Sequence, residues 1–387
     1  MIKNSLSLLF RQSSTTSSYK YTSKLCYYST STTSSTTSTS NQFKDIESTL
    51  RFNNYGIHKP VMVNEVIDRL HLKDGHCYID ATFGLGGHTL NILDRCKGSF
   101  VIAVDRDPKI FELTAKIRET YQDRLITLHG NFSNLSQLLK ERGLDTLKIS
   151  GVLMDFGCSS LQLDSPDRGF SFRKDFDGPL DMRMNNTDTS TQRLTATDIL
   201  NTFSNQQLRD IMYYYGEERH TLKVAHEIIR RRQYERIEKT SQLVDIIESC
   251  IPYPAAMKSI SRIFRSLRMF VNDETGEIYR GMREAEKILA PGGNLVVISF
   301  HSIEDRIAKR FFRNRCAVKR STLTPLQHDP SFEYVDGSQP LFPTDEEIEW
   351  NSRSKPAIVR SATRTSSSPL ILDDKEDEYL IYRSNQQ

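Results

Sequence analysis

The stretch Ile79-Asp80-Ala81-Thr82-Phe83-Gly84-Leu85-Gly86-Gly87-His88-Thr89, followed by Phe100-Val101-Ile102-Ala103-Val104-Asp105, decides the fold of this chain. A short apolar strand runs into a glycine-rich turn that opens a helix, and a second apolar strand ends on a carboxylate. Glycines let the backbone approach a ligand closely, and an acid about 20 residues further on accepts hydrogen bonds from ribose hydroxyls. The pattern predicts an open α/β sheet that binds an adenosine.

The spacing of the glycines distinguishes between adenosine cofactors. The dinucleotide fingerprint G-x-G-x-x-G would continue from Gly84 and Gly86 to a glycine at position 89, where this chain has Thr89. S-adenosylmethionine (SAM) carries no pyrophosphate, so its site needs close backbone approach and the ribose acid more than a phosphate cradle. The residues favour SAM, with a nicotinamide dinucleotide as the alternative.

Composition limits the class of protein. The 387 residues are enough for one large domain or two of ordinary size. The six cysteines form no C-x-x-C pair and no cluster with histidine, so neither a disulfide framework nor a metal site is expected. No apolar run approaches the roughly 20 residues that a membrane span needs. We therefore expect a soluble protein without a membrane partner.

The N-terminal segment differs in composition from the rest of the chain. Residues 1–44 contain five lysines and arginines but no acid, and residues 29–40 are all Ser or Thr. Such a basic, acid-free and Ser-rich leader is typical of a transit peptide and predicts the mitochondrial matrix, the alternative being a disordered low-complexity arm. Because the whole chain carries +3 and the leader +5, the remainder is net −2, and overall charge says nothing about nucleic-acid binding.

Apolar and amphipathic stretches alternate along much of the chain, which predicts a doubly wound, Rossmann-like parallel α/β sheet with an inserted helical domain. The expected divisions are a leader (1–44), a first part of the SAM-binding domain (45–164) and a helical insertion for substrate recognition (165–257). A second part of the sheet domain (258–372), with a long loop at 321–346, and a polar tail (373–387) follow. The expected strands are 77–82, 100–105, 125–129, 151–156, 295–300 and 357–363, and one helix is expected over 108–121.

Asp155 ends the fourth expected strand, beside the predicted cofactor turn, and is the candidate catalytic residue. The amine of a nucleobase is a poor nucleophile because its lone pair is delocalised into the ring. Hydrogen bonds from its N–H groups to a carboxylate would oppose that delocalisation as charge develops in the transition state. Asp155 could equally cap a turn or contact the cofactor.

Eight segments, in order, resemble the RsmH (MraW) family of SAM-dependent methyltransferases, which modify cytosine N4 in the decoding region of small-subunit ribosomal RNA. The resemblance covers about residues 57 to 364. The segments begin at Asp80, Ala103, His129, Asp155, Asp167, Gly178, Tyr215 and Ser299, and the last reads Ser299-Phe300-His301-Ser302-Ile303-Glu304-Asp305-Arg306.

The resemblance implies a cofactor site. Gly86, Gly87 and His88 would line the methionine and adenosine turn, and Asp105 would bind the ribose. Phe132 and Asp155 would flank the adenine and sulfonium region, and Gln162 would close the site. The residue patterns alone support only the two glycines and Asp105.

The expected substrate is small-subunit ribosomal RNA or the assembling subunit, and the oligomeric state is left open, a homodimer included. Residues 306–320 carry seven lysines and arginines and no acid, interleaved with Phe311 and Phe312, which suits phosphate contacts and base stacking. A helical stripe of Arg262, Arg265 and Arg268 is more typical of a solvated face. The alternative functions are a non-catalytic RNA-binding assembly factor and a DNA amino-methyltransferase.

Overall fold

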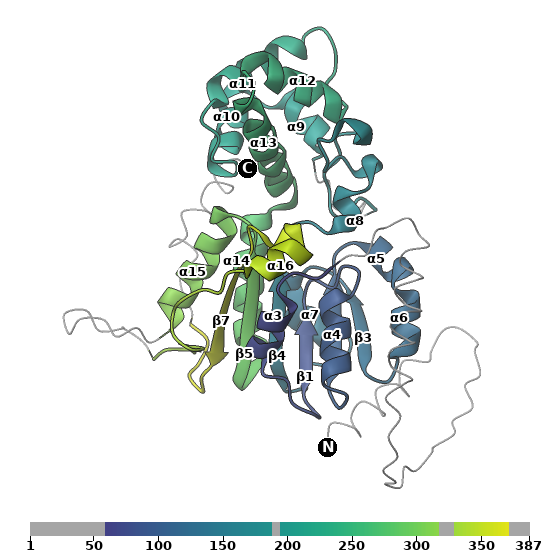
Figure 1. Cartoon of the computed structure of the whole chain (residues 1–387), viewed down its shortest axis with the longest axis vertical. Coiled ribbons are helices and arrows are strands. Elements are labelled where there is room, and N and C mark those ends of the chain that lie inside the picture. Colours follow the sequence, from purple (N-terminus) through teal and green to yellow (C-terminus); the bar gives the residue numbers. More distant parts are fainter. Residues whose placement is uncertain (1–58, 188–193, 317–328, 371–387) are drawn as a thin grey trace, which may run out of the picture.

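The computed structural model of the chain describes residues 59–187, 194–316 and 329–370. Its lower part is a seven-stranded sheet in the order β3-β2-β1-β4-β5-β7-β6 (Figure 1). Strands β1 to β5 run parallel, which confirms the Rossmann-like sheet, and β7 lies antiparallel between β5 and β6. The strands are β1 Cys77–Asp80, β2 Phe100–Asp105, β3 Leu125–His129, β4 Ile149–Asp155, β5 Leu289–Ser299, β6 Phe332–Tyr334 and β7 Ile358–Arg364.

The central strands are buried on both faces because helices cover each side of the sheet. In β4, Val152 and Met154 point into one hydrophobic cluster, and Leu153 points into the other. One cluster takes side chains from α3 Val63–Leu70, α4 Gly87–Arg95, α5 Pro108–Leu113 and α6 Ala115–Thr120. The opposite cluster takes them from α7 Leu135–Glu141, α14 Glu274–Ile288 and α15 Ser302–Arg315. This two-sided burial explains why the strands read as continuous apolar runs.

A helical unit stands above the carboxyl edge of the sheet (Figure 1). Its elements are α9 Ala196–Thr202, α10 Asn205–Tyr214, α11 Thr221–Arg231, α12 Thr240–Cys250 and α13 Ala255–Asn272. Ser204 caps α10 in a capping box with Gln207. The expected domain boundary at residues 257 and 258 falls inside α13. That helix stays with the helical unit to Asn272 because its apolar face, with Ile263 and Leu267, belongs to the core shared with α10 and α12.

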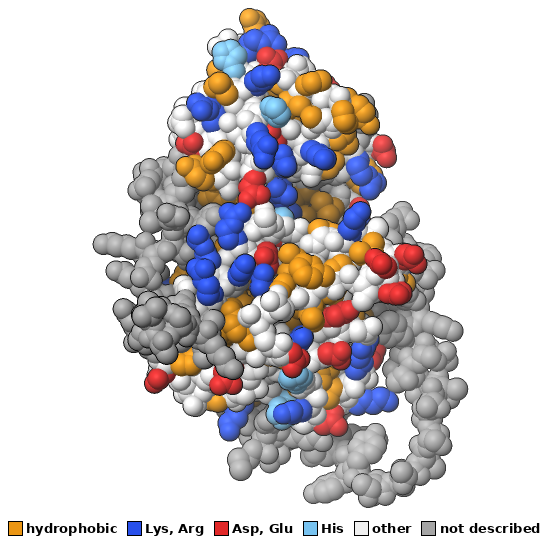
Figure 2. All heavy atoms as spheres, turned by 60° about the vertical axis from the view of Figure 1, so that its left-hand side comes forward, with side chains coloured by type: hydrophobic (Ala, Val, Ile, Leu, Met, Phe, Trp, Pro, Cys, Tyr) orange, Lys and Arg blue, Asp and Glu red, His pale blue; other side chains and the backbone are white. Residues whose placement is uncertain are grey.

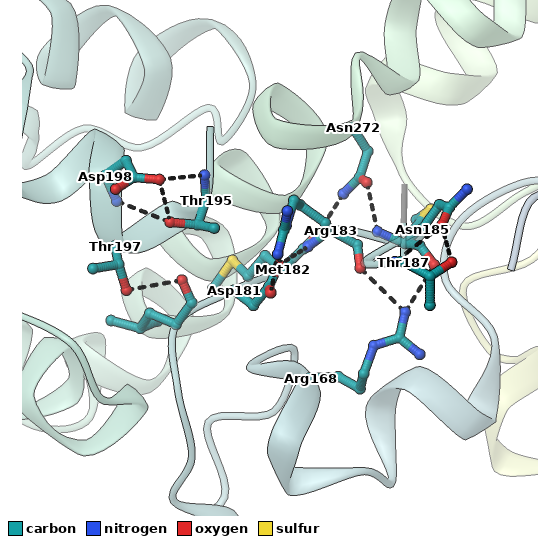
Figure 3. Close-up of polar contacts among 12 residues, drawn as sticks. Arg168, Asp181, Met182, Arg183, Asn185, Thr187, Thr195, Thr197, Asp198 and Asn272 are labelled. Carbon is teal, nitrogen blue, oxygen red and sulfur yellow. Dashed lines mark hydrogen bonds and ion pairs between the residues drawn. The ribbon is translucent and has the colours of Figure 1, made fainter. Parts of the chain in front are cut away.

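Asn272 and Arg168 tie the two units together where α13 ends (Figure 3). The Asn272 amide accepts a hydrogen bond from the Met184 N–H at 2.8 Å and donates one to the Met182 carbonyl at 2.7 Å. The buried Arg168 side chain donates to the Met184 carbonyl at 2.7 Å and pairs at 2.9 Å with Asp107, the N-cap of α5. Residues 182–184 are therefore held between the two units.

Two further segments differ from expectation. The single helix expected over 108–121 is broken into α5 and α6 at Thr114, whose hydroxyl donates to the Ile110 carbonyl at 2.7 Å. The expected loop 321–346 contains β6, which pairs with β7, and the start of α16 Asp345–Trp350, while residues 321–328 lie outside the described part. The expected leader, 1–44, and polar tail, 373–387, also lie outside it. In the described ranges, no helix combines the length and apolarity needed to cross a membrane.

Candidate functional site

A cavity of about 470 Å³ opens at the carboxyl edge of the parallel strands, below the helical unit. Figure 2 shows Lys and Arg side chains gathered on this side of the molecule, around the junction of the two units. The cavity is lined from the ends of β1 to β5 and from the junction of α13 with α14. The strand order reverses between β1 and β4, and open α/β sheets bind ligands at such a switch point. Its volume is in the range of small-molecule sites.

The glycine turn and Asp105 form one wall of the cavity. The Asp105 carboxylate accepts hydrogen bonds from the backbone N–H groups of Gly84 at 2.8 Å and Asp107 at 2.9 Å. Burial raises the pKa of Asp105 to about 6, although these two hydrogen bonds act to lower it. Each carboxylate oxygen keeps further lone pairs, so Asp105 can also accept hydrogen bonds from ligand hydroxyls.

Gly86 and Gly87 differ in their relation to the cavity. Gly87 lines it, whereas Gly86 is not among its lining residues. Gly86 caps α4 with φ at +82°, and a Cβ there would lie 3.0 Å from Ile117 and 3.1 Å from Phe83. The close packing and positive φ explain the glycine without a ligand contact. A Cβ on Gly87 would lie 2.9 Å from Pro60, which also lines the cavity.

Asp155 and His88 meet at the floor of the cavity. The Asp155 backbone N–H donates to the Thr82 hydroxyl at 2.8 Å, and His88 Nε2 lies 3.8 Å from the Asp155 carboxylate. Burial raises the pKa of Asp155 well above its usual value, and the charges of Asp80 and Glu304 raise it further. Asp155 Oδ1 is buried and accepts no hydrogen bond from any described residue. This carboxylate is therefore available to a ligand donor.

Thr89 has a structural role in place of the missing third glycine. Its hydroxyl donates at 2.7 Å to Asp80, a buried carboxyl at the end of β1 whose pKa burial raises to about 6. The bond ties the first turn of α4 to the strand.

Phe132 and Gln162 both line the cavity. The Phe132 ring packs against Phe156 with centroids 6.5 Å apart, and α14 passes so close that a Cβ on Gly281 would overlap the Phe132 ring. Gln162 is 3% exposed, and its amide donates to Asp107 at 3.2 Å and accepts from the Ser159 N–H at 3.1 Å. The structure thus brings the expected site residues together around one cavity, apart from Gly86.

A charged group at the other end of the cavity was not predicted. Arg268, read from the sequence as part of a solvated stripe, is mostly buried and makes a bidentate pair with Glu274 at 2.7 and 2.8 Å. His301 and Glu304 complete the group, with His301 Nε2 2.9 Å from Glu304 Oε1. Burial alone would raise the pKa of Glu304, but His301 and Arg268 lower it below its usual value. His301 and Glu304 lie in the segment 299–306, which carries the family resemblance, but the resemblance gave neither residue a role.

The described residues contain no cluster of three or more His, Cys, Asp or Glu that could hold a metal.

The prediction that Phe311 and Phe312 stack on bases is wrong. Both rings are buried in the core, 2% and 1% exposed, because they lie on the apolar face of α15. Arg315 is also buried and pairs with Glu286 at 2.7 Å. Arg306 pairs with Glu217 at 2.6 Å, and Lys309 and Arg313 remain on the surface. Residues 319 and 320 lie outside the described ranges.

Comparisons with known proteins identify relatives over most of the chain. Residues 56–365 match the model of the MraW methylase family. "12S rRNA N(4)-cytidine methyltransferase METTL15" of Mus musculus is 37% identical over 84% of this chain and 86% of its own length. "Ribosomal RNA small subunit methyltransferase H" of Methylobacterium nodulans is 41% identical over 80% of this chain and 91% of its own. A solved putative rRNA methylase from Clostridium thermocellum covers 81% of this chain and all of its own, with 10% identity and a TM-score of 0.37.

Proposed function

Because the chain belongs to the MraW methylase family, we propose that it transfers a methyl group from SAM to the N4 amine of a cytosine in small-subunit ribosomal RNA. The observation that carries the proposal is the cavity that joins the glycine turn and Asp105 to Asp155. A relative named as a 12S rRNA N(4)-cytidine methyltransferase is 37% identical over 84% of this chain, and one named as a small-subunit ribosomal RNA methyltransferase is 41% identical over 80% of it. A protein that only bound RNA would have no need of the ribose acid or of a carboxylate at the acceptor position.

The residues of the cavity fit SAM. Asp105 has free lone pairs for the ribose hydroxyls, and the turn at Gly84 and Gly87 leaves the backbone accessible. Phe132 and Gln162 would hold the adenine end, His88 the methionine side, and Gly86 the turn itself. When bound, SAM supplies an electrophilic methyl group on a positively charged sulfur.

Asp155 would act on the acceptor amine. Its carboxylate can accept an N–H hydrogen bond, which opposes delocalisation of the amine lone pair as N4 forms its new bond. Transfer of this kind is an in-line displacement that depends mainly on holding donor and acceptor in attack geometry. The cavity below the helical unit would receive a cytosine base that has turned out of its stack in the RNA.

We expect the purified protein to form N4-methylcytosine when it is incubated with labelled SAM and either unmodified small-subunit rRNA or small-subunit particles. Asp105→Ala should bind SAM roughly 10- to 100-fold more weakly, because hydrogen bonds to a charged group are worth about 1.5–3 kcal/mol. Mass spectrometry of nucleosides and calorimetric titration with SAM measure the two effects. Label absent from cytosine, or undiminished transfer by Asp105→Ala, would overturn the proposal. Comparing RNA with particles identifies the substrate form.

We further propose that the leader, residues 1–44, directs the protein to the mitochondrial matrix, because its composition is that of a transit peptide. The full chain, synthesised in vitro, should become protected from added protease when incubated with energised mitochondria. A chain that begins at residue 45 should remain digestible. Equal protection of both chains, or of neither, contradicts this proposal.

A further inference from the structure

The part of the cavity beyond Asp155 contains polar groups that the cofactor does not need. Along the carboxyl edge of the sheet, Asp105 ends β2, Asp155 ends β4, and His301 follows β5. Strand β1 with its glycine turn lies between β2 and β4. A cofactor held by Asp105 and the glycine turn would bring its reacting end toward Asp155. The acceptor would then lie on the β5 side, where His301 lines the cavity.

Glu304 is a fully buried carboxylate with its side chain 0% exposed. Oε2 accepts a hydrogen bond from the Phe300 N–H at 2.7 Å, and Oε1 lies 2.9 Å from His301 Nε2. Arg268 is 3.9 Å away, with its guanidinium bonded to Glu274. A buried carboxylate is costly unless it is paired or hydrogen-bonded, and the His301 ring is the nearest ionisable side chain to it, closer than Arg268.

His301 is a buried histidine whose ring makes no aligned hydrogen bond. Its side chain is 8% exposed, and both ring nitrogens are buried without a hydrogen-bond partner among the described residues, although Nε2 lies 2.9 Å from Glu304 Oε1. Because buried polar atoms are nearly always hydrogen-bonded, Nδ1, the nitrogen farther from Glu304, points to a ligand. A ring that turns its Nε2–H to the carboxylate keeps a lone pair on Nδ1, which can then act as a base.

We propose that His301, oriented by Glu304, is the catalytic residue that removes the proton from the acceptor amine. The inference rests on the proposed function. The amine has two hydrogens: Asp155 accepts one in a hydrogen bond, and His301 Nδ1 accepts the other. As the N4 lone pair bonds to the methyl carbon, the carbon–sulfur bond breaks and its electron pair stays on sulfur. One N4–H bond then breaks, its electron pair returns to N4, and the proton passes to Nδ1. The imidazolium that forms is stabilised by Glu304.

The test compares His301→Ala with wild type on the RNA that wild type methylates. A positioned base contributes about 100-fold or more, so kcat should fall by about that factor while the dissociation constants for SAM and RNA stay within about threefold. Added imidazole should restore part of the lost rate in His301→Ala, because a small base can occupy the vacated space. Glu304→Gln should lower kcat without being rescued. His76→Ala is the control, since His76 is bonded to Ser150 at 2.8 Å and is not among the cavity residues.

Three results would overturn the inference: a kcat for His301→Ala within threefold of wild type, a parallel loss of SAM affinity, or a loss of rate that imidazole does not restore. The second would assign His301 to the cofactor site, and the third would make its role structural. Failure of the proposed function is distinguishable, because wild type itself would then form no N4-methylcytosine.

Discussion

Replacing Asp155 with alanine is expected to lower kcat for methyl transfer about 1,000-fold, while the affinity for SAM falls by no more than about threefold. The substitution removes the only carboxylate that ends β4 inside the cavity, and with it the acceptor for the amine N–H. Single-turnover transfer measures the chemical step, and calorimetric titration measures SAM binding. Asp155→Asn keeps the shape but not the charge, and should recover only a small part of the rate.

The pH dependence of methyl transfer should also report the ionisation of the Asp155 carboxylate. Burial, with the charges of Asp80 and Glu304, raises the pKa of Asp155 well above its usual value. Only the ionised form accepts the amine hydrogen fully, so activity should be lost as pH falls through this raised pKa. The acid limb of kcat/KM, which reports the free enzyme, should therefore lie above the ordinary range of about 4 in His301→Ala as well as in wild type, so that the limb belongs to Asp155 and not to His301. An acid limb at that ordinary value, or loss of SAM binding by Asp155→Ala, would assign Asp155 to the cofactor.

The cofactor side of the cavity was predictable because its chemistry is local in sequence. A strand, a glycine turn and a strand ending in Asp105 lie within about 30 residues, and parallel strands bring their carboxyl ends to one edge. Gly86 illustrates the limit of that argument. The pattern identifies a glycine that the turn needs, but only the packing of Ile117 and Phe83 shows that it serves the fold and not the ligand surface.

The acceptor side was not predictable because it joins two pairs, Arg268 with Glu274 and His301 with Glu304, that lie about 30 residues apart in the chain. Arg268 reads as one of three arginines on a helical stripe, and nothing local shows that the turn at Asp273 returns Glu274 to it. Periodicity identifies which face of a helix is polar but not what that face meets. The same limit misled the interpretation of residues 306–320, where a run rich in arginine contains both surface and core positions.

Arg315 is the clearest core position in that run, and its replacement is expected to unfold the protein more readily without a direct effect on RNA. Arg315→Met would leave Glu286 buried without its counter-charge and remove the guanidinium that lies 3.8 Å from the Phe311 ring centre. Breaking a buried ion pair on one side costs about 3–5 kcal/mol, so the free energy of unfolding should fall by that amount. Urea denaturation followed by circular dichroism measures it.

The matched control is Arg313→Met, two residues away on the exposed face of α15. It should change the free energy of unfolding by less than about 0.5 kcal/mol, as surface substitutions do. A double variant, Glu286→Gln with Arg315→Met, should recover part of the lost stability because the carboxylate that paired with Arg315 is gone as well. The Ser331 hydroxyl, which donates to Glu286 at 2.6 Å, can keep this bond by donating to the amide oxygen of the new Gln side chain. Equal destabilisation by Arg315→Met and Arg313→Met would show that the pair contributes nothing, and would return Arg315 to the surface role that the sequence suggested.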